Sequence, residues 1–336
     1  EYFYFNNVAL KITPDSIRTV SYDDINFFIP SLAKKPYDFT MRVFKEPFTI
    51  TERQEYRDRL EAIDKKEKMQ NEDGSPVFSY DEIKRMRGEL MEWAQTYRWD
   101  VDWHGQQEKD LWPILRIVRG FSNVLWEREK EALRNKEQLT EDEIAVMNAH
   151  FANIISCIGR LCFRSWEGMK NIAPYLLEDN IADEKQAAGG SGKSALVNTV
   201  VGSAVNVLAV DMKDFMIITD AKFALTDLLL YPGMYRVVHW EDKQKSFPMK
   251  YFYNKVTQGT KVEKKFGDPV GLKMDDSPIH VITSNSPLSD DDPSTIGRFP
   301  LVSFSDRFAR ENQQKRQPER SPAELMKNYD PNPEKL

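Results

Sequence analysis

The sequence predicts an α/β fold, in which a central, mostly parallel sheet follows a mainly α-helical N-terminal region. Three observations predict it. Capped helical patterns fill residues 51–168, short apolar runs alternate with helix-length segments after Gly168, and a glycine cluster directly precedes a helix-like segment at residue 193. The 336 residues are enough for about two domains with a full-sized core.

The composition is that of a globular chain. Apolar residues make up 40% and charged residues 30%, with 19 Phe, 13 Tyr and 7 Trp, which excludes a disordered or fibrous protein. The apolar stretch at 200–210 has about half of the ~20 residues that a membrane helix needs, and no signal-peptide pattern opens the chain. We therefore expect no membrane segment. The formal net charge of -6 argues against a general basic coat for nucleic acid but does not exclude one basic loop.

The two cysteines, Cys157 and Cys162, match neither a redox nor a zinc pattern. We expect both thiols to be buried and inert, in a reducing compartment. This predicts a cytoplasmic protein. The four histidines are scattered along the chain, so they predict no metal site.

Residues 1–50 alternate aromatic and polar residues in short runs that prolines separate. Such runs predict short strands and turns. Because the chain begins at Glu1 rather than Met, we interpret this segment as the end of a longer upstream region.

Residues 51–168 are predicted to be mainly helical and to form an N-terminal, oligomerising domain. Three capping boxes, in which a hydroxyl and a side chain three residues later satisfy each other's backbone N–H, predict helix starts at Thr51, Ser79 and Thr140. The sequence also predicts a turn at 71–76 and interruptions of the helices at 103–105 and Gly120.

After a domain boundary near residue 168, the chain changes to the pattern of a parallel sheet with crossover helices. The predicted strands are 172–177, 205–210, 235–240 and 279–283. They define an α/β core at 169–312, followed by a polar arm at 313–336 with four prolines.

The strongest local motif is the run Gly189-Gly190-Ser191-Gly192-Lys193-Ser194, directly before the helix-like Ala195–Val201. Glycines let consecutive backbone N–H groups, here from Gly189 to Ala195, turn toward phosphate oxygens, and the helix N-terminus adds partial positive charge. Lys193 can reach β- and γ-phosphates, and Ser194 can hold Mg²⁺. The run therefore predicts a P-loop, although the full pattern would place glycine where the chain has Ala187. A glycine-rich turn with a chance match is the alternative.

Two further predicted strands end in polar groups that suit such a loop. The strand at 235–240 is followed by Glu241 and Asp242, which fit a division between water-mediated Mg²⁺ binding by Glu241 and orientation or activation of the attacking water by Asp242. The order of these two roles stays open. The strand at 279–283 leads to Asn285, whose amide can bond both the γ-phosphate and the attacking water. Taken alone, each is an ordinary strand end.

A basic loop lies between these two strands. A helix is predicted to end near Gly259, and a strand-turn-strand with Gly267 near its tip follows, exposing Lys264, Lys265 and Phe266. Two lysines and an aromatic ring can hold a phosphate backbone and stack on a base or sugar. Taken alone, this is more often a solvated hairpin.

The order of P-loop, acidic strand, basic hairpin and Ile-Thr-Ser-Asn strand resembles that of superfamily 3 helicases, the AAA+ motors of viral, phage and plasmid replication proteins, over about residues 140–312. It is most similar to primase-helicases of phages, satellites and integrated elements, the poxvirus-like branch, because the segment 150–161 also resembles theirs. The resemblance implies an AAA+ ATPase and DNA helicase that binds ATP and Mg²⁺ at the subunit interfaces of a homo-oligomer, a hexameric ring. It also implies that Lys264, Lys265 and Phe266 contact single-stranded or forked DNA, and that a primase or origin-binding module lies upstream. The resemblance further implies that the cytoplasm is that of a bacterium or of a virus-infected host cell.

The family further implies an arginine finger that acts on the neighbouring subunit's ATP. Arg298, 13 residues beyond Asn285, fits best and Arg307 is second. The planar, permanently charged guanidinium suits charge that spreads over a transferring phosphoryl group. Two other classes remain open: a P-loop switch or remodeller acting on protein partners, for example in phage defence, and a scaffold without hydrolysis.

Overall fold

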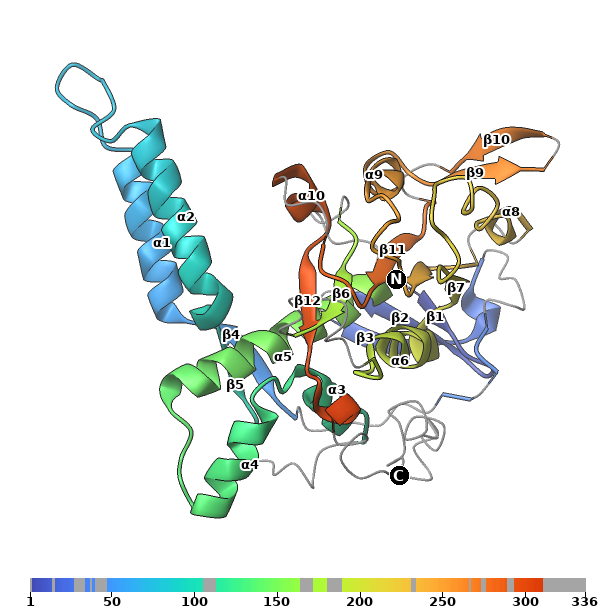
Figure 1. The fold of residues 1–336 in the computed structure, drawn as a ribbon, viewed down its shortest axis with the longest axis horizontal. Helices are drawn as coiled ribbons and strands as arrows, with labels where there is room; N and C mark the ends of the chain where they lie inside the picture. Colours follow the sequence, from blue (N-terminus) through green and yellow to red (C-terminus); the bar gives the residue numbers. More distant parts are fainter. Residues whose placement is uncertain are drawn as a thin grey trace.

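The computed structural model shows a mixed α/β protein, which confirms the predicted class (Figure 1). It describes residues 2–13, 16–26, 34–36, 38–39, 47–104, 113–163, 172–179, 189–230, 234–265, 267–272, 276–288 and 293–310. The predicted C-terminal arm at 313–336 lies outside these residues.

The centre of the described part is a five-stranded sheet in which every pairing is parallel. Its strands, in spatial order, are β12 (Leu301–Phe304), β6 (Tyr175–Glu178), β11 (Ile279–Thr283), β8 (Val237–Glu241) and β7 (Val207–Asp211). Because all run the same way, their carboxyl ends meet at one edge of the sheet. Strands β6, β7, β8 and β11 overlap the four predicted runs, whereas β12 was not predicted.

Successive strand residues alternate between two hydrophobic clusters, one on each face of the sheet. On β8, Val237 belongs to the cluster that contains Leu196 from the helix after the glycine loop. Trp240 belongs to the other cluster, with Phe252 of α9 (Lys250–Thr257). Both faces are therefore covered, and this explains why the central strands are continuously apolar.

Five helices occupy most of the described part of the predicted helical region. They are α1 (Gln54–Glu67), α2 (Tyr80–Tyr97), α3 (Pro113–Ser122), α4 (Trp126–Asn135) and α5 (Glu141–Cys162). The capping boxes at Ser79 and Thr140 are confirmed at the start of α2 and α5. The predicted turn at 71–76 joins α1 to α2, and Figure 1 shows this helix pair projecting from one side of the molecule.

Two local predictions in this region are wrong. Thr51 does not cap a helix, because it lies in strand β4 (Thr49–Glu52), paired with β5 (Trp99–Asp102), and α1 begins only at Gln54. The β-branched residues of β4 favour a strand, and its pairing overrides the local cap signal. Gly120 does not interrupt a helix but lies inside α3, where the ring of Phe308 occupies the space that a Cβ would need.

The N-terminal segment joins the same core as the sheet. Strands β1 (Tyr2–Tyr4), β2 (Ala9–Thr13) and β3 (Ser16–Val20) form an antiparallel sheet, as the short apolar runs predicted. Phe3 and Leu10 share one hydrophobic cluster with residues of α5 and of the central strands. The predicted boundary near residue 168 lies outside the described residues.

Three further short elements belong to the described part of the chain. They are η1 (Tyr22–Asp24), α8 (Asp227–Leu230) and α10 (Pro293–Arg298).

Within the described residues, only α5 is long and apolar enough to cross a membrane, but Phe151 and Ile154 bury it in the core, so no clear membrane-spanning helix is present there. Cys157 and Cys162 are buried in the same helix as free thiols, and burial raises their pKa to about 12 and about 11.

Candidate functional site

The glycine-rich loop has the backbone conformation that makes glycine necessary. Gly189, Gly190 and Gly192 have φ angles of 65°, 74° and 98°, a left-handed region that strains residues with side chains. A Cβ on Gly192 would also overlap the ring of Phe121 from α3. The clustering of glycines is therefore required by the geometry of the loop. Ala187, the departure from the full P-loop pattern, lies outside the described residues.

A helix begins directly after this loop. It consists of α6 (Lys193–Ala195), the π-helical turns η5 (Leu196–Val201) and α7 (Gly202–Ala204), with Gly192 as its N-cap. The first backbone N–H groups of a helix have no partner within it and carry the positive end of its dipole. The loop and first turn, from Gly189 to Ala195, thus form an arrangement that suits an anion.

Lys193 is the first residue of this helix and is buried, with 6% of its surface exposed. Its ammonium donates to Ser191 Oγ at 3.0 Å. Burial lowers the pKa of Lys193, while the negative charges of Glu178 and Asp242 act in the opposite direction. A positive charge held beside a loop of backbone donors is suited to phosphate oxygens. Ser194 follows it, half-buried, in the first helical turn.

The two predicted acids lie at the carboxyl end of β8. Glu241 is the last residue of the strand and Asp242 follows it with a φ of 53°, an unusual conformation for a residue other than glycine. Both are half-buried, and Lys213 Nζ lies 3.5 Å from Asp242 Oδ2. The negative charge of Asp242 raises the pKa of Lys193 against the effect of burial, so this carboxylate acts electrostatically on the ammonium beside the glycine loop.

Asn285 lies just beyond the carboxyl end of β11, in a loop that neighbouring hydrogen bonds hold in place. Ser284 Oγ donates to the carbonyl of Lys243 at 2.9 Å, and the Tyr175 hydroxyl donates to the carbonyl of Ser286 at 2.9 Å. The side chain of Asn285 is half-buried and forms no hydrogen bond with the part of the chain that the structure describes. Its amide is therefore available to a ligand.

The sheet topology brings these groups to one edge. Strand β11 lies between β6, which precedes the glycine loop, and β8, which ends in the acids. Ligands of open parallel sheets bind beyond the carboxyl ends of the strands. The structure thus places Lys193, Asp242 and Asn285 at the same end of three neighbouring strands.

A buried chain of hydrogen bonds, which the sequence did not predict, connects the helix after the glycine loop with β8 and β11 near this edge. His239 Nδ1 lies 2.8 Å from Asn198 Oδ1 on the helix after the loop, and His239 Nε2 lies 3.0 Å from Thr283 Oγ1 on β11. Burial lowers the pKa of His239 to about 4, against the charge of Asp242, so the ring is neutral. Nδ1–H then donates to Asn198, Nε2 accepts from the Thr283 hydroxyl, and Thr283 Oγ1 accepts from the Asp242 backbone N–H at 3.3 Å.

The two candidate arginines lie at opposite ends of the sheet. The Arg298 carbonyl accepts from the N–H of Ala173, before the start of β6, so this residue is remote from the glycine loop of its own chain. Its guanidinium donates to Ser294 and lies 5.2 Å from the ring centre of Tyr253. Arg307 instead follows the carboxyl end of β12, at the edge that holds the loop.

The predicted basic hairpin is present. Strands β9 (Lys261–Lys264) and β10 (Gly267–Gly271) pair antiparallel after α9 and Gly259, and Lys264 and Lys265 are exposed. Figure 1 shows the hairpin projecting from the side of the molecule opposite the α1–α2 pair. Phe266, the aromatic residue of the predicted DNA contact, lies outside the described residues.

The root of the hairpin is fixed to the sheet by a second buried chain that sequence reasoning missed. The Trp240 indole N–H donates to His280 Nδ1 at 3.0 Å, so the neutral ring carries its proton on Nε2 and donates to Thr260 Oγ1 at 2.8 Å. Burial, aided by the charge of Lys255, lowers the pKa of His280 to about 3. In the sequence, each of these hydrogen-bond chains is indicated by a histidine within a run of apolar strand residues. A buried polar side chain of this kind needs hydrogen-bond partners.

In the part of the chain that the structure describes, no three His, Cys, Asp or Glu side chains converge as a ready metal site. Comparison of the sequence with family models and with curated proteins finds no match to either.

Proposed function

We propose that the chain is the ATP-hydrolysing motor of an AAA+ helicase of superfamily 3, acting on single-stranded DNA with Mg²⁺ as the metal. One observation carries the proposal. The glycine loop with Lys193, the acid Asp242 and the amide Asn285 gather at the carboxyl ends of three neighbouring parallel strands. Each strand end is unremarkable alone, but together they offer phosphate donors, a carboxylate and an amide at one place.

The roles of the residues follow from their positions. The N–H groups of Gly189 to Ala195 and the Lys193 ammonium bind phosphate oxygens. Ser194 and Glu241 are the residues that would hold Mg²⁺, and the ion would supply positive charge against the phosphate oxygens. Asp242, whose negative charge acts on the Lys193 ammonium, orients or activates the attacking water. Asn285, on the strand between the loop and the acids, reaches the γ-phosphate and this water.

The position of Arg298 supports assembly into a ring. An arginine before the start of β6 cannot reach the loop beyond the end of β6 in the same chain, but a neighbouring copy can present it there. A head-to-tail contact repeated around an axis closes into a ring. Six subunits and an upstream primase or origin-binding module are what the family resemblance implies.

The hairpin supports the nucleic-acid part of the proposal. It projects from the body and exposes Lys264 and Lys265, whereas the whole chain has a net charge of -6. Positive charge is thus presented on one projecting element, as a strand-tracking loop requires.

The first experiment measures Mg²⁺-dependent ATP hydrolysis with and without single-stranded DNA. Removing the Lys193 charge in Lys193→Ala should lower kcat about 100-fold or more, as the loss of one preorganised electrostatic group does. Lys250→Ala, which removes an exposed lysine of α9, is the control. An inactive parent protein would overturn the proposal and favour a scaffold.

The second experiment tests the DNA contact. Lys264→Ala combined with Lys265→Ala should abolish unwinding and lower the salt slope of DNA binding by about two, one per phosphate contact. The matched control removes the exposed Lys245 and Lys250. If DNA does not change the rate of ATP hydrolysis and the protein does not unwind DNA, a remodeller of protein partners is favoured instead.

A further inference from the structure

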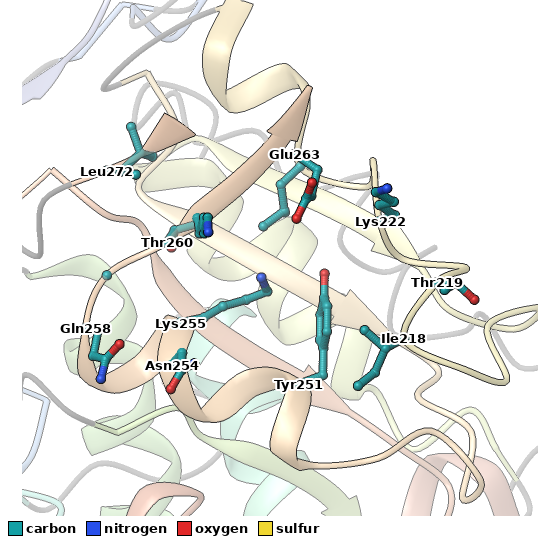
Figure 2. A pocket seen from close by; sticks show the side chains of 14 residues that line it. Ile218, Thr219, Lys222, Tyr251, Asn254, Lys255, Gln258, Thr260, Glu263 and Leu272 are labelled. Atoms are coloured by element: carbon teal, nitrogen blue, oxygen red, sulfur yellow. The ribbon is translucent and has the colours of Figure 1, made fainter. Parts of the chain in front are cut away.

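A cavity of about 650 Å³ lies at the root of the hairpin, apart from the carboxyl edge of the sheet. It is enclosed by α9, by the base of β9 and β10 and by the segment 218–225 (Figure 2). Lys222, Lys255 and Lys261 line it together with one acid, Glu263. Three lysines against one glutamate leave an excess of two positive charges, so the cavity suits an anion.

Lys255 is the central group of this cavity. In Figure 2 its ammonium lies in the middle of the labelled side chains, with Tyr251 on one side and Glu263 above it. The ammonium is 4.3 Å from the ring centre of Tyr251, and within the described residues it forms no hydrogen bond or ion pair. Burial lowers the pKa of Lys255 to about 8, although the charge of Glu263 opposes this shift.

A desolvated ammonium without a hydrogen-bond acceptor destabilises the folded protein. Ionisable groups with shifted pKa values that lie in a cleft are concentrated at functional sites. The lining also offers neutral donors, because the amides of Asn254 and Gln258 are exposed beside Lys255. Charge and neutral donors together match the oxygens of a phosphate group.

We propose that this cavity binds a phosphate group. The source that its position favours is the backbone of the DNA strand, because the cavity is continuous with the hairpin that carries Lys264 and Lys265 at its other end. That choice of source rests on the proposed function, whereas phosphate binding itself does not. A free nucleotide or inorganic phosphate is the other source of the same chemistry.

The experiment uses the full chain carrying Lys193→Ala, so that binding at the glycine loop is suppressed. Inorganic phosphate and a fluorescent oligothymidine are titrated separately in a phosphate-free buffer of constant ionic strength. Adding Lys255→Met should weaken binding about tenfold, because a charge-assisted contact is lost. Lys250→Met, on the exposed side of the same helix, should change binding less than about twofold.

Glu263→Gln gives an independent test that needs no loss of function. It removes the one repulsive charge of the cavity, so binding should become tighter by a few fold. Effects on both ligands support the DNA strand as the source, and an effect on inorganic phosphate alone supports a free phosphate. If Lys255→Met and Glu263→Gln both bind the two ligands like the Lys250→Met control, the proposal is overturned. This outcome does not depend on whether the parent protein hydrolyses ATP.

Discussion

His239 shows how one buried residue can position the candidate catalytic edge. It is fully buried on β8, between Asn198 of the helix after the loop and Thr283 of β11. Through the Thr283 hydroxyl it reaches the backbone N–H of Asp242, whose φ of 53° needs such support. We interpret His239 and Thr283 as positioning residues that hold the Asp242 carboxylate toward Lys193.

Replacing the Thr283 hydroxyl tests this interpretation. Thr283→Val keeps the shape of the side chain but leaves His239 Nε2 and the Asp242 N–H unsatisfied, which costs about 1–3 kcal/mol. The carboxylate should lose its orientation, so kcat for ATP should fall about tenfold with little change in KM. Thr283→Ser, which restores the hydroxyl, should recover the parent rate. Equal rates for the Val and Ser variants would remove the positioning role.

Strand β8 is the element that connects the candidate site at the carboxyl edge with the root of the hairpin. Because its side chains alternate between faces, His239 bonds toward the helix after the glycine loop while Trp240, the next residue, bonds toward the hairpin root through His280. His239 and Trp240 are the two residues before Glu241. A displacement of the acidic end of β8 would therefore change the hydrogen bonds of His239 toward the loop helix and those of Trp240 toward the hairpin root.

The hairpin root should be sensitive to acid through His280. Its pKa is about 3 in the folded protein and about 6.5 when unfolded, so the unfolded chain binds more protons between these values. The stability that the neutral ring contributes is fully present above pH 6.5 and is lost as pH falls, by up to about 3 kcal/mol at pH 4.

Urea unfolding at pH 7 and pH 4.5 checks this prediction. His280→Gln removes the titrating group but keeps a hydrogen-bonding side chain, so its stability should change less between the two pH values than that of the parent protein. His104→Gln, which replaces an exposed histidine, is the control. An identical pH dependence of His280→Gln and the parent would contradict the assignment.

The elements that the sequence predicted well are those whose signal is local. The central strands are apolar on both faces, and the caps of α2 and α5 use side chains three residues apart. Strand β4 was missed because its partner, β5, is far away in the sequence: Thr49 pairs with Asp102, 53 residues later. Pairing at such a distance leaves no mark in a short window of sequence.

The same limit applies to the site. The glycine loop and the acids are contiguous motifs and could be read directly, but the partners of His239 and the cavity around Lys255 are assembled from separate elements. Only the folded chain brings them together. The family spacing ranked Arg298 above Arg307, but the sequence did not predict that they lie at opposite ends of the sheet, because that depends on the strand order.

At the scale of the whole molecule, a ring makes a prediction that one subunit alone cannot satisfy. If Arg298 completes the site of a neighbouring copy, Lys193→Ala and Arg298→Ala are each inactive alone. A mixed ring contains interfaces in which an intact loop meets an intact arginine, so an equimolar mixture should regain about one quarter of the parent ATPase activity. Arg307 lies at the edge of the sheet that holds the glycine loop of the same chain. Mixing Arg307→Ala with Lys193→Ala should therefore give no ATPase activity beyond that of the two variants measured separately. Recovery in the second mixture and not in the first would give the role between subunits to Arg307 and remove it from Arg298.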